Sequence, residues 1–230
     1  MITSLHSPHI AAVKALLGAR GAKERRERGA FVVEGLQNIR ELLKSAPQDV
    51  LQIFISDEGR ERLSTTDLSS FNVIEVSDQV MAAMTDTVTP QGVLAVSAIR
   101  TRSFEEWLSE NTSKSPLRIA FFWQIQDPGN AGTVIRTADA FGFDAIIFSD
   151  NSVDAYAPKV VRSTAGSLWH IELFQALGGF QRAHEIRDAA AQVGWRFEQH
   201  FAHHVCGALQ HGIVDRKSTR LNSSHVALSR

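Results

Sequence analysis

The stretch from Arg118 to Asp150, RIAFFWQIQDPGNAGTVIRTADAFGFDAIIFSD, constrains the fold more than any other part of the chain. Residues 118–125 form a nearly continuous apolar run, which suits a strand buried on both faces of a parallel sheet. Residues 133–141 repeat apolar side chains at helical spacing, and a second apolar run covers 143–148. Gly142 fits the end of the helix. Two buried strands joined by one helix make a right-handed βαβ unit, so the sequence predicts an α/β fold.

The segment 127–133 follows the first of these strands, and ligands in such sheets bind beyond the carboxyl ends of the strands. It begins with four turn formers, from which we expect a loop and a helix capped by Asn130. Arg136 is expected about one turn into that helix, off its apolar face. The residues alone favour a structural explanation, in which Arg136 is a surface residue paired with Asp139. The segment is not G-x-G-x-x-G, so a dinucleotide site is not supported.

The same residues resemble the first signature motif of the SpoU (TrmH-like) family of RNA ribose 2′-O-methyltransferases. In that motif an asparagine and a short glycine-containing loop precede G-T-[IV]-I-R-T-A, which matches Asn130 and residues 132–138 here. Residues 157–173, APKVVRSTAGSLWHIEL, are similar to the next segment of the family. The resemblance implies that Arg136 is catalytic and that Asn130 organises the site.

Composition agrees with an ordinary globular protein of 230 residues, 43% of them hydrophobic. No apolar run is long enough to span a bilayer, and residues 1–20 lack the apolar core of a secretory signal. The single Cys206 excludes an internal disulfide and suits a reducing cytosol, so we expect a cytoplasmic protein. The formal net charge is −1, so an RNA partner must be bound by local basic patches.

The most basic stretch lies near the N-terminus. Such a run is either a solvated helix end or an arm that contacts phosphates. Beside the family motif, RNA contact becomes the better interpretation. The candidate RNA-binding residues in this stretch are Lys14, Arg20, Lys23, Arg25, Arg26 and Arg28.

Short apolar runs alternate with helical patterns in the first hundred residues, which predicts a small α/β domain. Strands are expected at 31–34, 50–55, 72–76 and 91–99, and a helix at 36–46. The segments GAFVVEGLQNIRELL and TPQGVLAV resemble parts of the family's ribosomal-protein-like substrate-binding domain. Glu34 closes the first strand; we interpret it as an acid at a helix N-terminus rather than part of an RNA surface.

Domain boundaries follow from these patterns. We expect an RNA substrate-binding domain at 1–99, a polar linker with one helical turn at 100–116, and a partial methyltransferase domain at 117–214. Within the latter, helices are expected at 158–168 and 180–193, and strands at 171–174 and 195–201. Lys159 and Arg162 share one face of the first helix, which is either solvated or in contact with RNA phosphates.

Four histidines and one cysteine crowd together at the end of the last expected strand and just after it: His200, His203, His204, Cys206 and His211. Their spacing matches no two-plus-two zinc pattern. We therefore expect a histidine-rich surface segment and no metal.

The last residues, 215–230, show no apolar periodicity and no counterpart in the family. Residues 215–225, DRKSTRLNSSH, match the translation of a common sequencing adapter, so we expect a non-native tail joined near Val214. The tail holds four basic residues and one acid, and the rest of the chain has a formal net charge of −4. The family resemblance implies an α/β knot methyltransferase domain that is incomplete here. Two later family motifs, which in the family form the trefoil knot, most of the S-adenosylmethionine pocket and much of the dimer contact, are missing. The cofactor-binding residues are therefore unknown.

The family resemblance implies an enzyme that transfers a methyl group from S-adenosylmethionine to a ribose 2′-hydroxyl of ribosomal or transfer RNA, as a homodimer when complete. We expect this chain alone to bind the cofactor poorly and to be inactive. One alternative is a non-catalytic RNA-binding protein of the same fold. A weaker alternative is an α/β protein that binds a small molecule; steeply salt-dependent RNA binding would argue against it.

Overall fold

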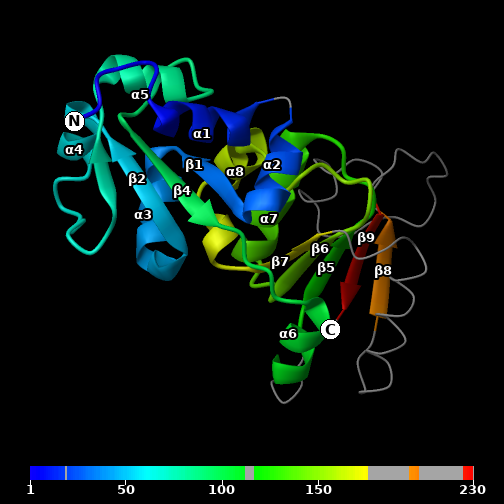
Figure 1. The fold of residues 1–230 in the computed structure, drawn as a ribbon. Helices are drawn as coiled ribbons and strands as arrows, with labels where there is room; N and C mark the ends of the chain where they lie inside the picture. The colour runs from blue at the N-terminus through cyan, green and yellow to red at the C-terminus, as the bar shows by residue number, and fades with distance from the viewer. Residues whose placement is uncertain (19, 112–116, 176–196, 202–224, 230) are drawn as a thin grey trace. The chain divides into compact units, whose positions relative to one another are not determined.

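The chain folds into two compact units in the computed structural model (Figure 1). The first contains Met1–Thr101 and Tyr156–Trp169, and the second contains Arg102–Ala155 and His170–Arg230. The first unit therefore takes a segment from the part of the chain expected to belong to the methyltransferase domain. The structure describes residues 1–18, 20–111, 117–175, 197–201 and 225–229, the last two ranges by their backbone only.

A four-stranded mixed sheet with the order β1-β4-β2-β3 forms the centre of the first unit. Strand β4 pairs antiparallel with β1 and β2, while β2 and β3 are parallel. The expected strands of this part of the chain are confirmed. They are β1 (Ala30–Glu34), β2 (Val50–Ile55), β3 (Val73–Glu75) and β4 (Val93–Ala98).

Helices and turns pack on both faces of this sheet, so β1 is buried along its whole length. Val32 faces a core cluster with side chains of α1 and α5, whereas Phe31, one residue earlier, stacks on Trp169 with ring centroids 5.8 Å apart. The helices of the unit are α1 (Pro8–Leu17), α2 (Gly21–Arg28), α3 (Leu36–Ser45), α4 (Asp57–Arg62), α5 (Asp78–Met84) and α8 (Pro158–Thr164), with 3-10 turns η1 (Pro47–Asp49) and η2 (Ser167–Trp169).

Helix α4 approaches the start of β4 so closely that only glycine fits at the contact. A Cβ added to Gly59 would lie 2.0 Å from the carbonyl oxygen of Gly92, which also accepts a hydrogen bond from the Ser56 backbone N–H at 2.8 Å. We therefore expect Gly59→Ala to lower the free energy of unfolding by about 1–3 kcal/mol, the usual cost of overpacking. Urea denaturation measures the change. Arg60→Ala, which breaks only the exposed ion pair with Glu75, is the control and should cost less than about 1 kcal/mol. Equal losses would contradict the steric explanation.

Three parallel strands form one side of the sheet of the second unit, as the sequence predicts. The order is β7-β6-β5-β9-β8, in which β9 pairs antiparallel with both β5 and β8. Strand β9 belongs to the segment 215–230 that we expect to be non-native, and its backbone occupies the edge of β5. The strands are β5 (Ile119–Phe122), β6 (Ala145–Phe148), β7 (Glu172–Gln175), β8 (Phe197–Phe201) and β9 (His225–Ser229).

The segment expected as a linker contains α6 (Phe104–Asn111), which is longer than the single expected turn. Ser103 and Glu106 form a capping box, in which each backbone N–H donates to the other residue's side chain at 3.0–3.1 Å. The hydrogen bond from the Ser103 backbone N–H lowers the pKa of the Glu106 carboxyl. The helix buries Phe104 and Trp107 against Phe174 of β7, so it belongs to the core of the second unit.

Helix α7 (Pro128–Ala140) begins five residues earlier than the sequence analysis predicted. Asp127, not Asn130, is its N-cap, and the Asp127 carboxylate accepts a hydrogen bond from the Asn130 backbone N–H at 2.7 Å. Pro128 at the first helical position needs no N–H partner, so the Asp-Pro pair starts a helix here. The expected loop 127–133 is therefore the first turn and a half of α7. Gly142 follows its end with φ of +67°, as expected of a glycine at that position.

Two expectations lie outside the described residues: the helix at 180–193 and the histidine-rich segment at 202–211. Among the helices that are described, none has the length and apolar character needed to cross a membrane.

Candidate functional site

Arg136 lies on the exposed side of α7, and its guanidinium has no hydrogen bond or ion pair with any described residue. The pairing with Asp139 expected from their spacing is wrong. The Asp139 carboxylate instead lies 3.1 Å from Nδ1 of His170. Because α7 starts at Pro128, Arg136 lies more than two turns from its N-terminus, rather than the one turn that we predicted. Arg136 is thus a solvated cation on a helix whose opposite face is buried.

Asn130 is exposed in the first turn of α7, and its side chain has no hydrogen-bond partner among the described residues. Six residues separate it from Arg136, so ideal helix geometry places the two about 9 Å apart along the axis and about 120° apart around it. They therefore do not form one compact pair. Any substrate that contacts both must extend along the helix.

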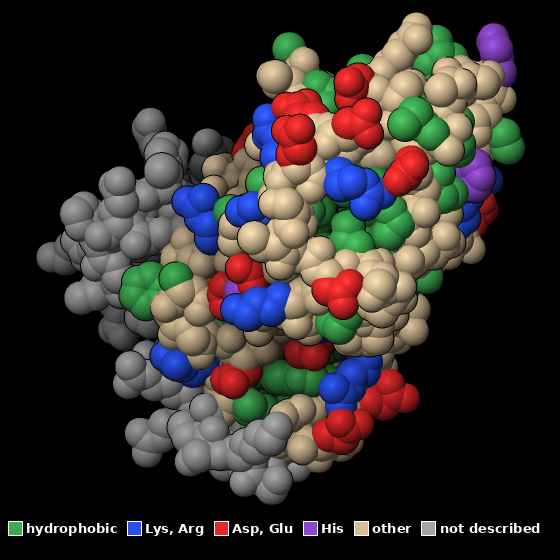
Figure 2. All heavy atoms as spheres, turned by 90° about the vertical axis from the view of Figure 1, so that its left-hand side faces the viewer, with side chains coloured by type: hydrophobic (Ala, Val, Ile, Leu, Met, Phe, Trp, Pro, Cys, Tyr) green, Lys and Arg blue, Asp and Glu red, His purple; other side chains and the backbone are tan. Residues whose placement is uncertain are grey.

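The eight predicted RNA-binding residues differ in how available their charges are. Lys23 and Arg28 form exposed ion pairs with glutamates one turn away on α2. Those with an exposed side chain and no partner among the described residues are Lys14, Arg20, Arg26 and Lys159. On the face in Figure 2, basic side chains are dispersed among acidic ones and form no continuous patch.

Arg25 does not belong with those exposed cations. It is buried, and its guanidinium donates a hydrogen bond to the backbone carbonyl of Leu16 in α1. Gly21 is required beside it because an added Cβ would lie 2.5 Å from the same Leu16 oxygen. Arg25 therefore holds α2 against the end of α1. A run of basic residues in the sequence does not reveal which of them has a buried side chain.

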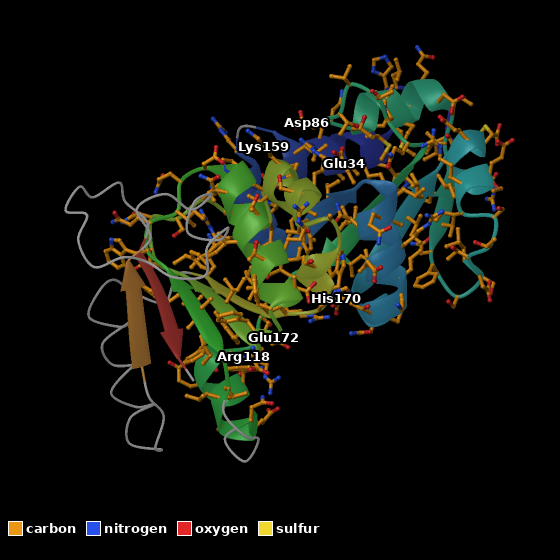
Figure 3. The ribbon with its side chains drawn as sticks, turned by 180° about the vertical axis from the view of Figure 1, so that it is seen from behind. Glu34, Asp86, Arg118, Lys159, His170 and Glu172 are labelled. Atoms are coloured by element: carbon orange, nitrogen blue, oxygen red, sulfur yellow. The ribbon has the colours of Figure 1, made fainter. Side chains whose placement is uncertain are left out.

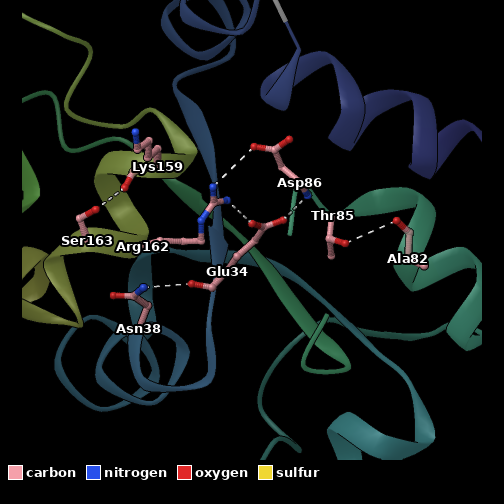
Figure 4. A network of polar contacts seen from close by, with 8 residues as sticks. All are labelled: Glu34, Asn38, Ala82, Thr85, Asp86, Lys159, Arg162 and Ser163. Carbon is pink, nitrogen blue, oxygen red and sulfur yellow. Dashed lines mark hydrogen bonds and ion pairs between the residues drawn. The ribbon is translucent and has the colours of Figure 1, made fainter. Parts of the chain in front are cut away.

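The guanidinium of Arg162 is also engaged by other side chains, in a network with Glu34 and Asp86 that Figure 4 shows. Its guanidinium donates to the Glu34 carboxylate at 2.6 Å and lies 3.6 Å from that of Asp86. The second carboxylate oxygen of Glu34 accepts the Asp86 backbone N–H at 2.9 Å. Glu34 is buried with both oxygens used. The interpretation of Glu34 as an acid at a helix N-terminus is thus wrong: it compensates an arginine 128 residues away in the chain.

The carboxyl edge of β5 and β6 is closed by hydrogen bonds between its own loops. The Ser149 hydroxyl accepts the Gln124 backbone N–H at 2.7 Å, and the Gln126 amide donates to the Asn151 carbonyl. The Gln175 amide carbonyl accepts the Ala155 backbone N–H at 3.0 Å. These hydrogen bonds join the segments after β5 and β6 to each other and to the end of β7. Among the described residues, no three His, Cys, Asp or Glu side chains come together as a metal site.

The Asp139–His170 pair was missed by the sequence analysis. Figure 3 shows His170 and Glu172 near Arg118, at the amino-terminal end of the parallel strands. The Arg118 guanidinium lies over the ring of Phe143, 5.9 Å from its centroid. The Asp139–His170 contact joins the last turn of α7 to the segment just before β7. The two residues are 31 positions apart, and no local spacing in the sequence signals a contact over that distance.

Comparison with known proteins gives two family matches along the chain. Residues 8–95 match the MRM3-like substrate binding domain, and residues 117–194 match the SpoU rRNA Methylase family. The fold and these matches define the class: a parallel α/β methylase domain preceded by a substrate-binding domain. Residues 117–194 carry a SpoU rRNA methylase domain, as the first motif predicted.

Named relatives agree with this assignment. The chain is 36% identical over 150 residues to the 23S rRNA (guanosine(2553)-2'-O)-methyltransferase RlmP of Bacillus subtilis, covering 65% of this chain and 55% of that protein. It is 28% identical over 159 residues to the mitochondrial rRNA methyltransferase 3A of Danio rerio, covering 69% and 37%. The AdoMet-bound rRNA methyltransferase from Sinorhizobium meliloti matches with a TM-score of 0.62 and 26% identity, over 82% of this chain and 68% of that one. The chain thus spans only about half, or less, of these two sequence relatives.

Proposed function

We propose that the complete protein transfers a methyl group from S-adenosylmethionine to a ribose 2′-hydroxyl of ribosomal RNA. The observation that carries the proposal is the unpaired, exposed Arg136 within the N-A-G-T-V-I-R-T-A segment of α7. An arginine keeps its proton at ordinary pH, so it does not serve readily as a base. Arg136 instead orients the hydroxyl and its adjacent phosphate and stabilises the negative charge that develops on the oxygen.

The proposal extends to four further predictions of the sequence analysis. The boundaries near residues 99 and 116, the non-native origin of 215–230, the homodimer and the cytoplasmic location belong to it. Transfer RNA is the second candidate substrate class. S-Adenosylmethionine supplies the methyl group when bound, and the residues that hold it are unknown, because the two family motifs that form most of its pocket are absent from this chain. This chain supplies RNA binding and the cation at the hydroxyl.

A methyl-transfer assay tests the enzyme proposal. The full-length protein, with its frame restored after Val214, is incubated with radiolabelled S-adenosylmethionine and either ribosomal or transfer RNA. We expect label only in ribosomal RNA, in a product that resists alkaline cleavage at the modified ribose. Binding of RNA without transfer would overturn the enzyme proposal and support the non-catalytic alternative. Transfer of the methyl group to a base would contradict the ribose 2′-hydroxyl as the site of methylation.

RNA binding by the 230-residue chain is tested separately through its exposed cations. We expect the triple replacement of Lys14, Arg20 and Arg26 by alanine to weaken RNA binding about tenfold near 100 mM salt. The slope of log affinity against log salt should fall by about 2, since each lost phosphate contact removes about 0.7 for single strands. The charge-matched control replaces Lys44, Arg60 and Arg62. Equal effects of the two triple variants would contradict a specific role for the N-terminal cations.

A further inference from the structure

The first unit contains a solvent-open groove of about 490 Å³ between the start of α3, the segment 85–93 that precedes β4, and α8. This volume falls in the range of sites that hold one small organic group, and it is too small to admit a duplex. Threonines at alternate positions, Thr85, Thr87 and Thr89, line one side. Arg40 of α3 lines the groove too.

The floor of the groove is fixed and electrically compensated. The Glu34 carboxylate has the Arg162 guanidinium and the Asp86 backbone N–H as partners, and the Asn38 amide donates to the Glu34 carbonyl at 3.0 Å. The Gln91 amide carbonyl accepts the Leu36 backbone N–H at 2.7 Å, which ties the segment 85–93 to the start of α3. A ligand therefore meets a preformed surface that needs no additional charge to balance it.

Several groups on the walls remain free to bind. The hydroxyls of Thr87 and Thr89 have no hydrogen-bond partner among the described residues. Arg40 uses one guanidinium nitrogen on the Arg62 carbonyl, at 3.0 Å, and keeps other N–H groups for a ligand. Leu36 and Val93 add apolar side chains to the lining. The groove thus combines apolar contact area, neutral hydrogen-bonding groups and one cation at its margin.

We propose that this groove binds one unpaired nucleotide of the RNA, with the base against the Thr87–Thr89 wall and a flanking phosphate beside Arg40. Unpaired bases present a planar apolar face and a hydrogen-bonding edge together, whereas a helical stem buries both. The hydroxyls can donate or accept, so they match the mixed edge of a base. The inference rests on the proposed RNA-binding function and adds a single-stranded element as its target.

The test measures binding of the 230-residue chain to a fluorescent single-stranded RNA of about 12 nucleotides and to the same sequence as a duplex. The double variant Thr87→Val, Thr89→Val removes the two hydroxyls and keeps side-chain volume. We expect it to weaken single-strand binding roughly 5–20-fold, consistent with the loss of two hydrogen bonds, with an unchanged salt slope and unchanged duplex binding. Arg40→Gln should lower the salt slope by about 0.7. Thr65→Val, at an exposed threonine outside the groove, is the matched control.

The outcomes separate this inference from the function on which it rests. Wild-type single-strand binding that is unaltered by the threonine and Arg40 variants overturns the groove and leaves RNA binding standing. Absence of RNA binding by the wild-type chain overturns both. Photo-crosslinking of RNA that contains 4-thiouridine gives a readout independent of affinity: crosslinks within residues 85–91 are expected, and crosslinks confined to α1 and α2 would contradict the groove.

Discussion

Replacing Arg136 with alanine in the full-length protein is expected to lower the rate of methyl transfer about 10²–10³-fold, the usual effect of removing one preorganised group that stabilises developing charge. S-Adenosylmethionine and RNA affinity should each change by less than about threefold, because a group that acts mainly in the transition state contributes little to ground-state binding. The side chain is exposed and has no partner among the described residues, so its removal leaves no buried group unpaired.

Single-turnover methyl transfer measures the rate, and calorimetry measures cofactor affinity. Arg136→Lys retains the charge without the planar fork and should recover only part of the rate. Arg118→Ala is the control, since it removes another exposed arginine of the same unit whose guanidinium lies over Phe143. A rate within about threefold of wild type would refute the catalytic role. Loss of cofactor binding together with turnover would indicate a structural role instead.

Replacing Arg162 with alanine is expected to lower the free energy of unfolding by about 3–5 kcal/mol, because it leaves the Glu34 carboxylate buried without its cation. Arg28→Ala is the matched control. It removes an arginine from an ion pair with a similar distance, 3.0 Å, but both of its partners are partly exposed, so a loss below about 1 kcal/mol is expected.

Chemical denaturation of the 230-residue chain gives both values. The double variant Arg162→Met, Glu34→Leu tests the cause, since removing both charges together should recover much of the loss. If Arg162→Ala costs no more than Arg28→Ala, the network in Figure 4 does not stabilise the first unit.

Local patterns predicted the elements that local forces determine. The strands β1, β2 and β4 and the helix α3 follow from runs of apolar residues at period 2 or 3.6, and their boundaries lie close to the expected ones. The early start of α7 and the length of α6 also follow from local sequence signals, which the sequence analysis did not use. Asp127-Pro128 is an N-cap followed by the favoured first residue, and Ser103 with Glu106 is a capping box.

The candidate site was only partly accessible to sequence reasoning. The family motif predicted roles for Arg136 and Asn130, which stay predictions, and spacing wrongly assigned Asp139 as the partner of Arg136. Neither the burial of Arg25 nor the pairing of Arg162 with Glu34 can be read from charge runs, because each depends on which side chains the fold turns inward. Such long-range pairs are decided by tertiary packing, which no local periodicity encodes.

The inclusion of Tyr156–Trp169 in the first unit has a consequence for synthesis of the protein. A chain emerging from the ribosome has produced the whole of the sheet of that unit by residue 98, yet Arg162 and Trp169 are not made until much later. During that interval Glu34 lacks its cation and Phe31 lacks its stacked ring. The N-terminal unit therefore reaches its final structure only after most of the parallel strands of the second unit have been translated, so completion of the first domain depends on translation of the domain that follows it.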